Sequence, residues 1–209
     1  MLVDQRMYAQ KTSARASAGR QTTDVLLRVL AERSPALGDD LDDVTDLCRR
    51  VGEALALPDE EMVPLLQAAA LRDVGNAAIP DALLAKAGPS DEAERSFMRR
   101  HTLIGERILG GAPALAKAAL LVRSSHERID GGGYPDGLLG DAIPLGARVI
   151  AACDAYHAMV SDRPYRAGSS PDAAMAELTA CAGTQFDPRV VAAVCAVLAP
   201  ARTTLATPA

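Results

Sequence analysis

The chain contains only three histidines, and two of them lie in one stretch together with several carboxylates. His126 and Glu127 come directly before a glycine-rich turn, and His157 follows Asp154 at a spacing of three residues. His101 lies one expected helix upstream of that turn. Imidazoles and carboxylates are the side chains that ligate transition metals and transfer protons near neutral pH. Their clustering indicates a chemical site rather than scattered surface residues.

The charge of the chain limits the partners of such a site. A formal net charge of -5 gives no general attraction to a nucleic acid polymer or an anionic membrane. Basic residues can still gather locally around a phosphate ligand, and Arg163 with Arg166 closes the stretch as a basic pair. No apolar run reaches the ~18 residues that cross a bilayer, and the N-terminus does not resemble a signal peptide. We therefore expect a cytoplasmic protein.

Helices are expected to position these side chains. Hydrophobic residues make up 49% of the chain and aromatics only 3%, so alanine and aliphatic side chains must fill the core. Alanine-rich segments with aliphatics at helical spacing favour an all-α domain. We expect a linker in residues 1–20, the domain in residues 21–199 and a flexible tail in residues 200–209.

Several helix starts are marked in the sequence. A residue among Thr22, Thr23 and Asp24 is expected to cap a first helix, and Asp91 with Glu94 forms a capping-box pattern. Three prolines suit the first helical position: Pro144, Pro171 and Pro188. Pro64 is tolerable only in the first turn of its helix, which should begin near Glu60. One continuous helix is expected to carry Phe97, His101, Ile104, Gly105 and Ile108 along one side.

From about residue 38 to 199 the sequence resembles the HD-GYP domain, a branch of the HD phosphohydrolases. Leu71–Asn76 and Ile79–Asp81 stand where that family has His-Asp-x-Gly-Lys and Ile-Pro-Asp. The other segments match Met-Arg-x-His, His-His-Glu, Gly-Tyr-Pro and a long Asp-to-Arg run: Met98–His101, Ser125–Glu127, Gly131–Pro135 and Asp154–Arg166. The resemblance implies an all-helical HD-GYP-type bundle that holds two or three metal ions and linearises cyclic di-GMP.

The resemblance also assigns roles to individual residues. It implies metal ligands at Asp73, His101, His126 and Asp154, with Asp73 also catalytic. It implies contacts to the dinucleotide from a second set of residues: Asn76, Gly133, Tyr134, Pro135, Arg163 and Arg166. In such a site two metals bridge a water, lower its pKa and neutralise the phosphate under attack.

The chain departs from the family pattern at five positions. Leu41, Arg72 and Ser125 stand where the family has histidines, Asn76 replaces a lysine, and His157 stands at an aspartate position. Three histidines are too few for a His-rich binuclear site. The ligand count leaves room for one or two ions, iron or manganese, or for none. We hypothesise that Arg72 replaces part of the metal charge by pairing with Asp73 and Asp154.

Purely structural roles remain as alternatives for the same residues. His101 lies on an apolar face and could be a buried, hydrogen-bonded histidine. Without metal, Asp73 could cap a turn, and Asp154 could pair with an arginine in a buried network. We interpret His157 as a packing or hydrogen-bonding residue rather than a ligand.

Two functions follow from the resemblance and its departures. The first is a degenerate, non-catalytic signalling module that binds cyclic di-GMP, a related dinucleotide or a protein partner. The second is a metal-dependent cyclic di-GMP phosphodiesterase with a reduced ligand set. A third interpretation, without a function, is a decaying gene fragment. Residues 4–11 also resemble the final helix of a GGDEF domain, which makes cyclic di-GMP. The resemblance implies that residues 1–20 hold the remnant of a GGDEF domain in a GGDEF–HD-GYP arrangement that has lost its first domain. A GGDEF-type or other signalling protein is the expected protein partner.

Overall fold

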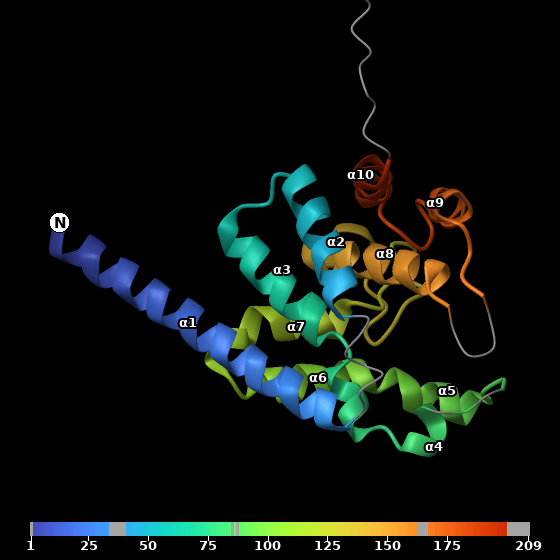
Figure 1. The fold of residues 1–209 in the computed structure, drawn as a ribbon, viewed down its shortest axis with the longest axis horizontal. Helices are drawn as coiled ribbons and strands as arrows, with labels where there is room; N and C mark the ends of the chain where they lie inside the picture. The colour runs from blue at the N-terminus through green and yellow to red at the C-terminus, as the bar shows by residue number, and fades with distance from the viewer. Residues whose placement is uncertain (1, 34–40, 85, 87, 163–166, 200–209) are drawn as a thin grey trace, which may run out of the picture.

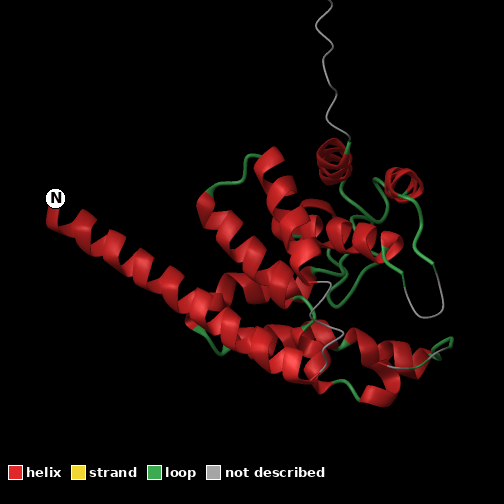
Figure 2. Ribbon diagram, viewed as in Figure 1, coloured by secondary structure: helices red, strands yellow, loops and turns green. Residues whose placement is uncertain are grey.

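The computed structural model describes residues 2–33, 41–84, 86, 88–162 and 167–199 (Figure 1). Within these ranges every regular element is a helix, and only two isolated β-bridges occur (Figure 2). The main helices are α1 (Leu2–Arg33), α2 (Leu41–Ala54), α3 (Asp59–Leu71), α4 (Asp81–Leu84), α5 (Glu92–Arg99), α6 (His101–Gly110), α7 (Ala116–Ser124), α8 (Leu145–Val160), α9 (Pro171–Ala180) and α10 (Pro188–Leu198). Short 3-10 helices are η2 (Val74–Ala78), η3 (Pro113–Leu115) and η4 (Gly140–Ala142). The all-α prediction is confirmed.

Helix α1 differs from the sequence expectation. It runs without a break through the residues expected to form a linker, and its N-terminal half projects away from the body of the molecule (Figure 1). The hydroxyls of Thr22 and Thr23 each donate to the carbonyl four residues earlier, at 2.9 Å, so neither residue caps a helix. The expected cap was wrong because threonine can satisfy its hydroxyl inside a helix.

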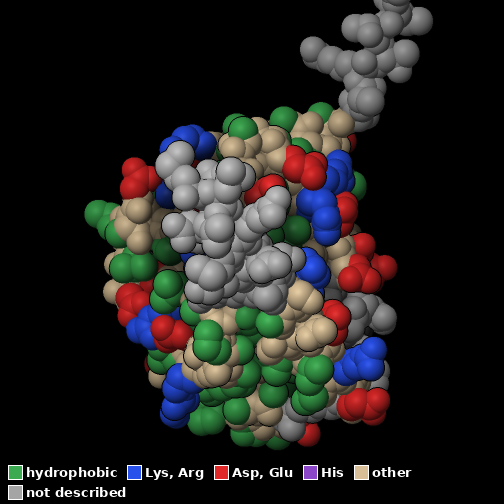
Figure 3. Space-filling view, turned by 90° about the vertical axis from the view of Figure 1, so that its left-hand side faces the viewer, with side chains coloured by type: hydrophobic (Ala, Val, Ile, Leu, Met, Phe, Trp, Pro, Cys, Tyr) green, Lys and Arg blue, Asp and Glu red, His purple; other side chains and the backbone are tan. Residues whose placement is uncertain are grey.

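The C-terminal half of α1 packs on the body through Thr23 and Leu30, which are buried. On the face toward which α1 projects, hydrophobic side chains gather in the lower part with charged side chains around them (Figure 3). None of the described helices combines the length and the apolar character that a membrane span requires.

The core lies between α2, α3 and α8, with α10 over one end (Figure 1). Val44, Cys48 and Val51 are fully buried on one face of α2. They meet Leu65 of α3 and Ile150 of α8, which are also buried. Small alanines at the contacts let these helices approach closely, which is how a core poor in aromatics is filled.

Some local expectations are confirmed and others are wrong. The capping box at Asp91 and Glu94 is present, with backbone-to-carboxylate bonds of 2.8 and 2.9 Å. Ser170 and Asp187 cap α9 and α10, each followed by proline at the first helical position. Pro144 instead occupies the cap position of α8. Pro64 lies beyond the first turn of α3, which begins at Asp59.

The helix expected to carry both Phe97 and His101 is two helices. α5 ends at Arg99 and α6 begins at His101. The break brings the start of α6 against η2, where Gly75 leaves no room for a side chain. A Cβ on Gly75 would overlap the His101 carbonyl group and lie 2.9 Å from the Gly105 nitrogen. This close backbone approach sets the distance between Asp73, at the start of η2, and His101.

Candidate functional site

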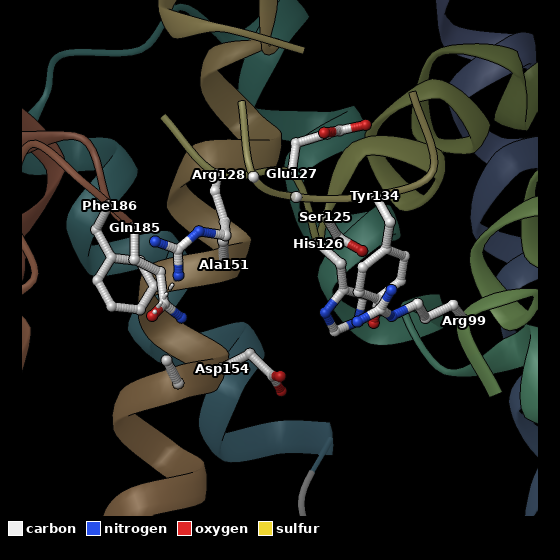
Figure 4. A pocket seen from close by; sticks show the side chains of 13 residues that line it. Arg99, Ser125, His126, Glu127, Arg128, Tyr134, Ala151, Asp154, Gln185 and Phe186 are labelled. Atoms are coloured by element: carbon white, nitrogen blue, oxygen red, sulfur yellow. Dashed lines mark hydrogen bonds between the residues drawn. The ribbon is translucent and has the colours of Figure 1, made fainter. Parts of the chain in front are cut away.

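A cavity of about 410 Å³ lies between α8, the loop after α7 and the turn before α10 (Figure 4). His126 and Tyr134 contribute to one side of it, Arg128 and Phe186 to the other, and Asp154 lies below them (Figure 4). The volume is in the range of small-molecule sites. The cavity therefore brings together residues from separate segments that the sequence marked as chemical.

Arg72 directly follows the last residue of α3 and pairs with Asp154, which lines the cavity. Its Nε lies 2.7 Å from Asp154 Oδ1 and 3.5 Å from Asp73 Oδ2, and its side chain is only 8% exposed. Its Nη1 also donates to the Ala69 carbonyl at 3.2 Å. Burial acts to lower the pKa of Arg72, but the two carboxylates outweigh it and raise that pKa. Arg72 is thus a fixed cation between the Asp73 and Asp154 side chains. This is the arrangement required by the hypothesis that Arg72 replaces part of the metal charge.

Asp73 does not cap its helix through a side-chain bond. Its Oδ1 accepts from Asn76 Nδ2 at 3.0 Å. Burial raises the pKa of Asp73, and the neighbouring Arg72 opposes this shift. In the described part of the chain, Asn76 Oδ1 is a buried acceptor without a hydrogen-bond partner. A buried acceptor of this kind can be satisfied by an ordered water.

Two histidines face each other in the site. The ring centroids of His101 and His126 are 4.8 Å apart at an interplanar angle of 79°. His101 Nδ1 lies 2.8 Å from the Met98 carbonyl, a contact that orients the ring and leaves Nε2 for another partner. Burial, with His101 adding to it, lowers the pKa of His126 to about 4. His126 is therefore neutral near pH 7, and its ring stacks on Tyr134 with centroids 5.1 Å apart.

Glu127 anchors the glycine-rich loop. It is 4% exposed, and its carboxylate accepts the backbone N–H groups of Asp136 at 2.7 Å and Leu138 at 3.0 Å. Gly133 passes so close to Glu127 that a Cβ would lie 2.5 Å from the Glu127 Cα. These contacts fix Tyr134 in the cavity wall. The sequence motif contained Glu127, but its role as the loop anchor depends on the fold.

Glu127→Ala should therefore loosen the loop. We expect the free energy of unfolding to fall by about 2 kcal/mol, because two backbone N–H groups lose the buried carboxylate that accepts from them. Urea denaturation followed by circular dichroism measures the loss. Glu106→Ala is the matched control: Glu106 pairs with Arg123 but is 27% exposed, so its loss should stay below about 1 kcal/mol. Equal losses in the two variants would contradict the anchoring role.

Further cavity residues were not predicted from the sequence. The Arg99 guanidinium lies 5.3 Å from the centroid of the Tyr134 ring. Arg128, Gln185 and Phe186 form the opposite side (Figure 4). Arg99 was part of the Met98–His101 motif and could have been singled out. Gln185 and Phe186 carry no local signal, since they reach the cavity only through the fold.

The remaining predicted residues are placed as follows. His157 lies 3.2 Å from Ser161 Oγ and 3.8 Å from Asp43, which agrees with a hydrogen-bonding role. Gly133 and Tyr134 line the cavity. Pro135 follows Tyr134 through a cis peptide bond. Arg163 and Arg166 lie outside the described residues, as does the expected tail at 200–209.

The arrangement of these side chains does not match a metal site. Among the residues that the structure describes, no three His, Cys, Asp or Glu side chains are placed to hold one. The cation that Asp154 meets is the Arg72 guanidinium, at 2.7 Å, and arginine offers no lone pair to a metal. As arranged, the side chains do not fit a divalent ion, so the predicted ligand roles of Asp73, His101, His126 and Asp154 stay predictions.

Comparisons with known proteins give the family. A family model described as "HD domain" matches residues 24–190. The chain is 41% identical over 174 residues to the cyclic di-GMP phosphodiesterase response regulator RpfG of Xanthomonas campestris, covering 82% of this chain and 46% of the relative. It is 37% identical over 149 residues to the 3'3'-cGAMP-specific phosphodiesterase 3 of Vibrio cholerae, covering 71% of this chain and 32% of the relative.

Solved structures agree on the fold. Bd1817, a HDG"Y"P protein from Bdellovibrio bacteriovorus, superposes with a TM-score of 0.64 at 15% identity, over 90% of this chain and 63% of that one. A cyclic GMP-AMP specific phosphodiesterase of V. cholerae gives 0.55 at 29% identity, over 85% of this chain and 41% of that one. The chain spans less than half the length of the two curated relatives, RpfG and the 3'3'-cGAMP-specific phosphodiesterase 3. It belongs to the HD domain family, in the HD-GYP branch.

Proposed function

We propose that this HD-GYP domain binds a cyclic dinucleotide for signalling and does not hydrolyse it efficiently. The observation that carries the proposal is the Arg72 side chain, which is 8% exposed and 2.7 Å from Asp154. A guanidinium supplies positive charge to the neighbouring carboxylates, but it cannot lower the pKa of a bound water as a metal does. The site would retain charge balance and lose the means of making a hydroxide.

The ligand class is inferred from relatives and from the cavity. The relatives named above are a cyclic di-GMP phosphodiesterase response regulator and a 3'3'-cGAMP-specific phosphodiesterase. Tyr134, stacked on His126, offers an aromatic surface beside the cavity, and stacking on such surfaces contributes to nucleotide binding. Asn76 is proposed as a further ligand contact on the strength of the family resemblance. Arg163 and Arg166 are proposed to contact the phosphates, as the family resemblance implies.

The proposal predicts binding without turnover. Isothermal titration calorimetry should detect cyclic di-GMP or 3'3'-cGAMP binding that persists in EDTA. Incubation with Mn²⁺, or with Fe²⁺ under anaerobic conditions, should give no linear product by chromatography. Arg72→His alone should not create turnover, because Asn76 and Ser125 remain. Metal-dependent cleavage by the unaltered chain, abolished by Asp73→Ala, would overturn the non-catalytic assignment.

A second candidate is metal-dependent hydrolysis with a reduced ligand set. The orientation of His101 favours it, since Nδ1 is held 2.8 Å from the Met98 carbonyl and Nε2 is left for another atom. Backbone carbonyls commonly hold metal-ligating histidines in this way. The cleavage experiment distinguishes the two candidates directly.

A further inference from the structure

The two sides of the cavity carry different side chains (Figure 4). On one side the exposed Arg99 lies over the Tyr134 ring, with 5.3 Å between the guanidinium carbon and the ring centroid. On the other side Arg128, Gln185 and the largely buried Phe186 stand together. A ligand in this cavity would therefore meet a cation near one side and a set of hydrogen-bonding groups beside an aromatic ring at the other.

The charge of Arg128 is compensated within the protein. Its Nε donates to Asp130 Oδ1 at 3.0 Å, and its Nη2 donates to Oδ2 at 2.6 Å. The Gly132 N–H also donates to Asp130 at 2.9 Å. The bond from Arg128, with that of Gly132, lowers the pKa of Asp130 to about 2, so the pair is ionised at neutral pH. Arg128 is thus suited to donate to a neutral acceptor through its other N–H groups.

The orientation of the Gln185 amide follows from its partner. Arg128 Nη1 lies 3.2 Å from Gln185 Oε1. A guanidinium has donors only, so only the amide oxygen can pair with it, and the NH₂ group keeps its donors for another partner. The backbone of Gln185 is held by bonds to Cys181 at 3.0 Å and Ile129 at 3.3 Å. The hydrogen-bonding groups that remain on this side are therefore donors, next to the Phe186 ring.

We propose that Arg128, Gln185 and Phe186 form a nucleobase subsite that selects guanine over adenine. This inference rests on the proposed dinucleotide binding. Guanine offers two acceptors, N7 and O6, along one edge, whereas adenine pairs its N7 acceptor with an N6 amino donor. An edge of donors fits guanine and meets the adenine amino group unfavourably. Arg99, on the other side, is placed to meet the phosphate attached to that nucleoside.

Changes at Gln185 test the subsite. The unaltered chain should bind cyclic di-GMP on the order of ten- to a hundredfold more tightly than cyclic di-AMP, as measured by calorimetry. Gln185→Leu removes the amide donors, leaving only those of Arg128, and should reduce this preference to a few-fold. Gln185→Glu stays able to pair with Arg128 but presents an acceptor oxygen, so it should abolish or reverse the preference.

Gln21→Glu is the matched control, because it makes the same chemical change at an exposed position on α1. It should leave both affinities within about twofold, and thermal melting should report an intact fold in every variant. Equal affinities for the two dinucleotides, or a preference that Gln185→Glu leaves unchanged, would overturn the subsite while dinucleotide binding still stands. Binding of no cyclic dinucleotide would remove the proposed function and the subsite together.

Discussion

Gly75→Ala is expected to lower the free energy of unfolding by about 3 kcal/mol or more, the upper end of overpacking costs. The added methyl group would overlap the His101 carbonyl and lie 2.9 Å from the Gly105 nitrogen. These are backbone atoms at the start of α6, so they cannot turn away as a flexible side chain would. The clash should push η2 from α6 and separate Asp73 from His101. Urea denaturation followed by circular dichroism measures the change.

Gly110→Ala is the control for this prediction. Gly110 ends α6, and a Cβ there would have no other heavy atom within 4 Å. Because alanine favours a helix over glycine by up to about 1 kcal/mol, this variant should be neutral or slightly stabilised. If Gly75→Ala unfolds within about 1 kcal/mol of the unaltered chain, the close approach of η2 to α6 is not as described.

Arg72→Met is expected to lower the free energy of unfolding by about 2–3 kcal/mol. The substitution leaves Asp73 and Asp154 without their cation at the edge of the core. Removing one partner of a fully buried ion pair costs about 3–5 kcal/mol. The cost should be lower here because the Asp73 and Asp154 side chains keep 31% and 34% of their surface exposed. Chemical denaturation at pH 7 gives the measurement.

A double-mutant cycle separates the ion pair from lost packing. Asp154→Leu combined with Arg72→Met should recover part of the stability, so that the two effects are not additive. Arg95→Met is the matched control, since Arg95 pairs with Glu92 at 2.8 Å but both side chains are at least half exposed. That change should cost less than about 1 kcal/mol. Additive effects at positions 72 and 154 would mean that the pair contributes nothing of its own.

The helices were predictable where short-range chemistry decides them. The capping box at Asp91 and Glu94 and the caps at Ser170 and Asp187 depend on residues within one turn of each other. Thr22 and Thr23 misled the interpretation because a threonine hydroxyl serves equally well as a cap or as a donor to the preceding turn. Local sequence does not decide between those outcomes; packing on the rest of the chain does.

The site was predictable only in part, for a different reason. Motifs identified His101, His126 and Asp154, and the adjacency of Arg72 to Asp73 suggested the ion pair now described. The side formed by Arg128 and Gln185 joins residues 57 positions apart in the chain. Nothing near either residue indicates the other, so this contact appears only once the turn before α10 folds against the glycine-rich loop.

Helix α1 has a mechanical consequence. Thirty-two residues in one helix make a rod about 48 Å long, at 1.5 Å per residue. Its C-terminal part, buried at Thr23 and Leu30, packs against α3, and Arg72 directly follows the last residue of α3. A torque applied to the projecting end would therefore be transmitted through a rigid lever to the helix that carries Arg72.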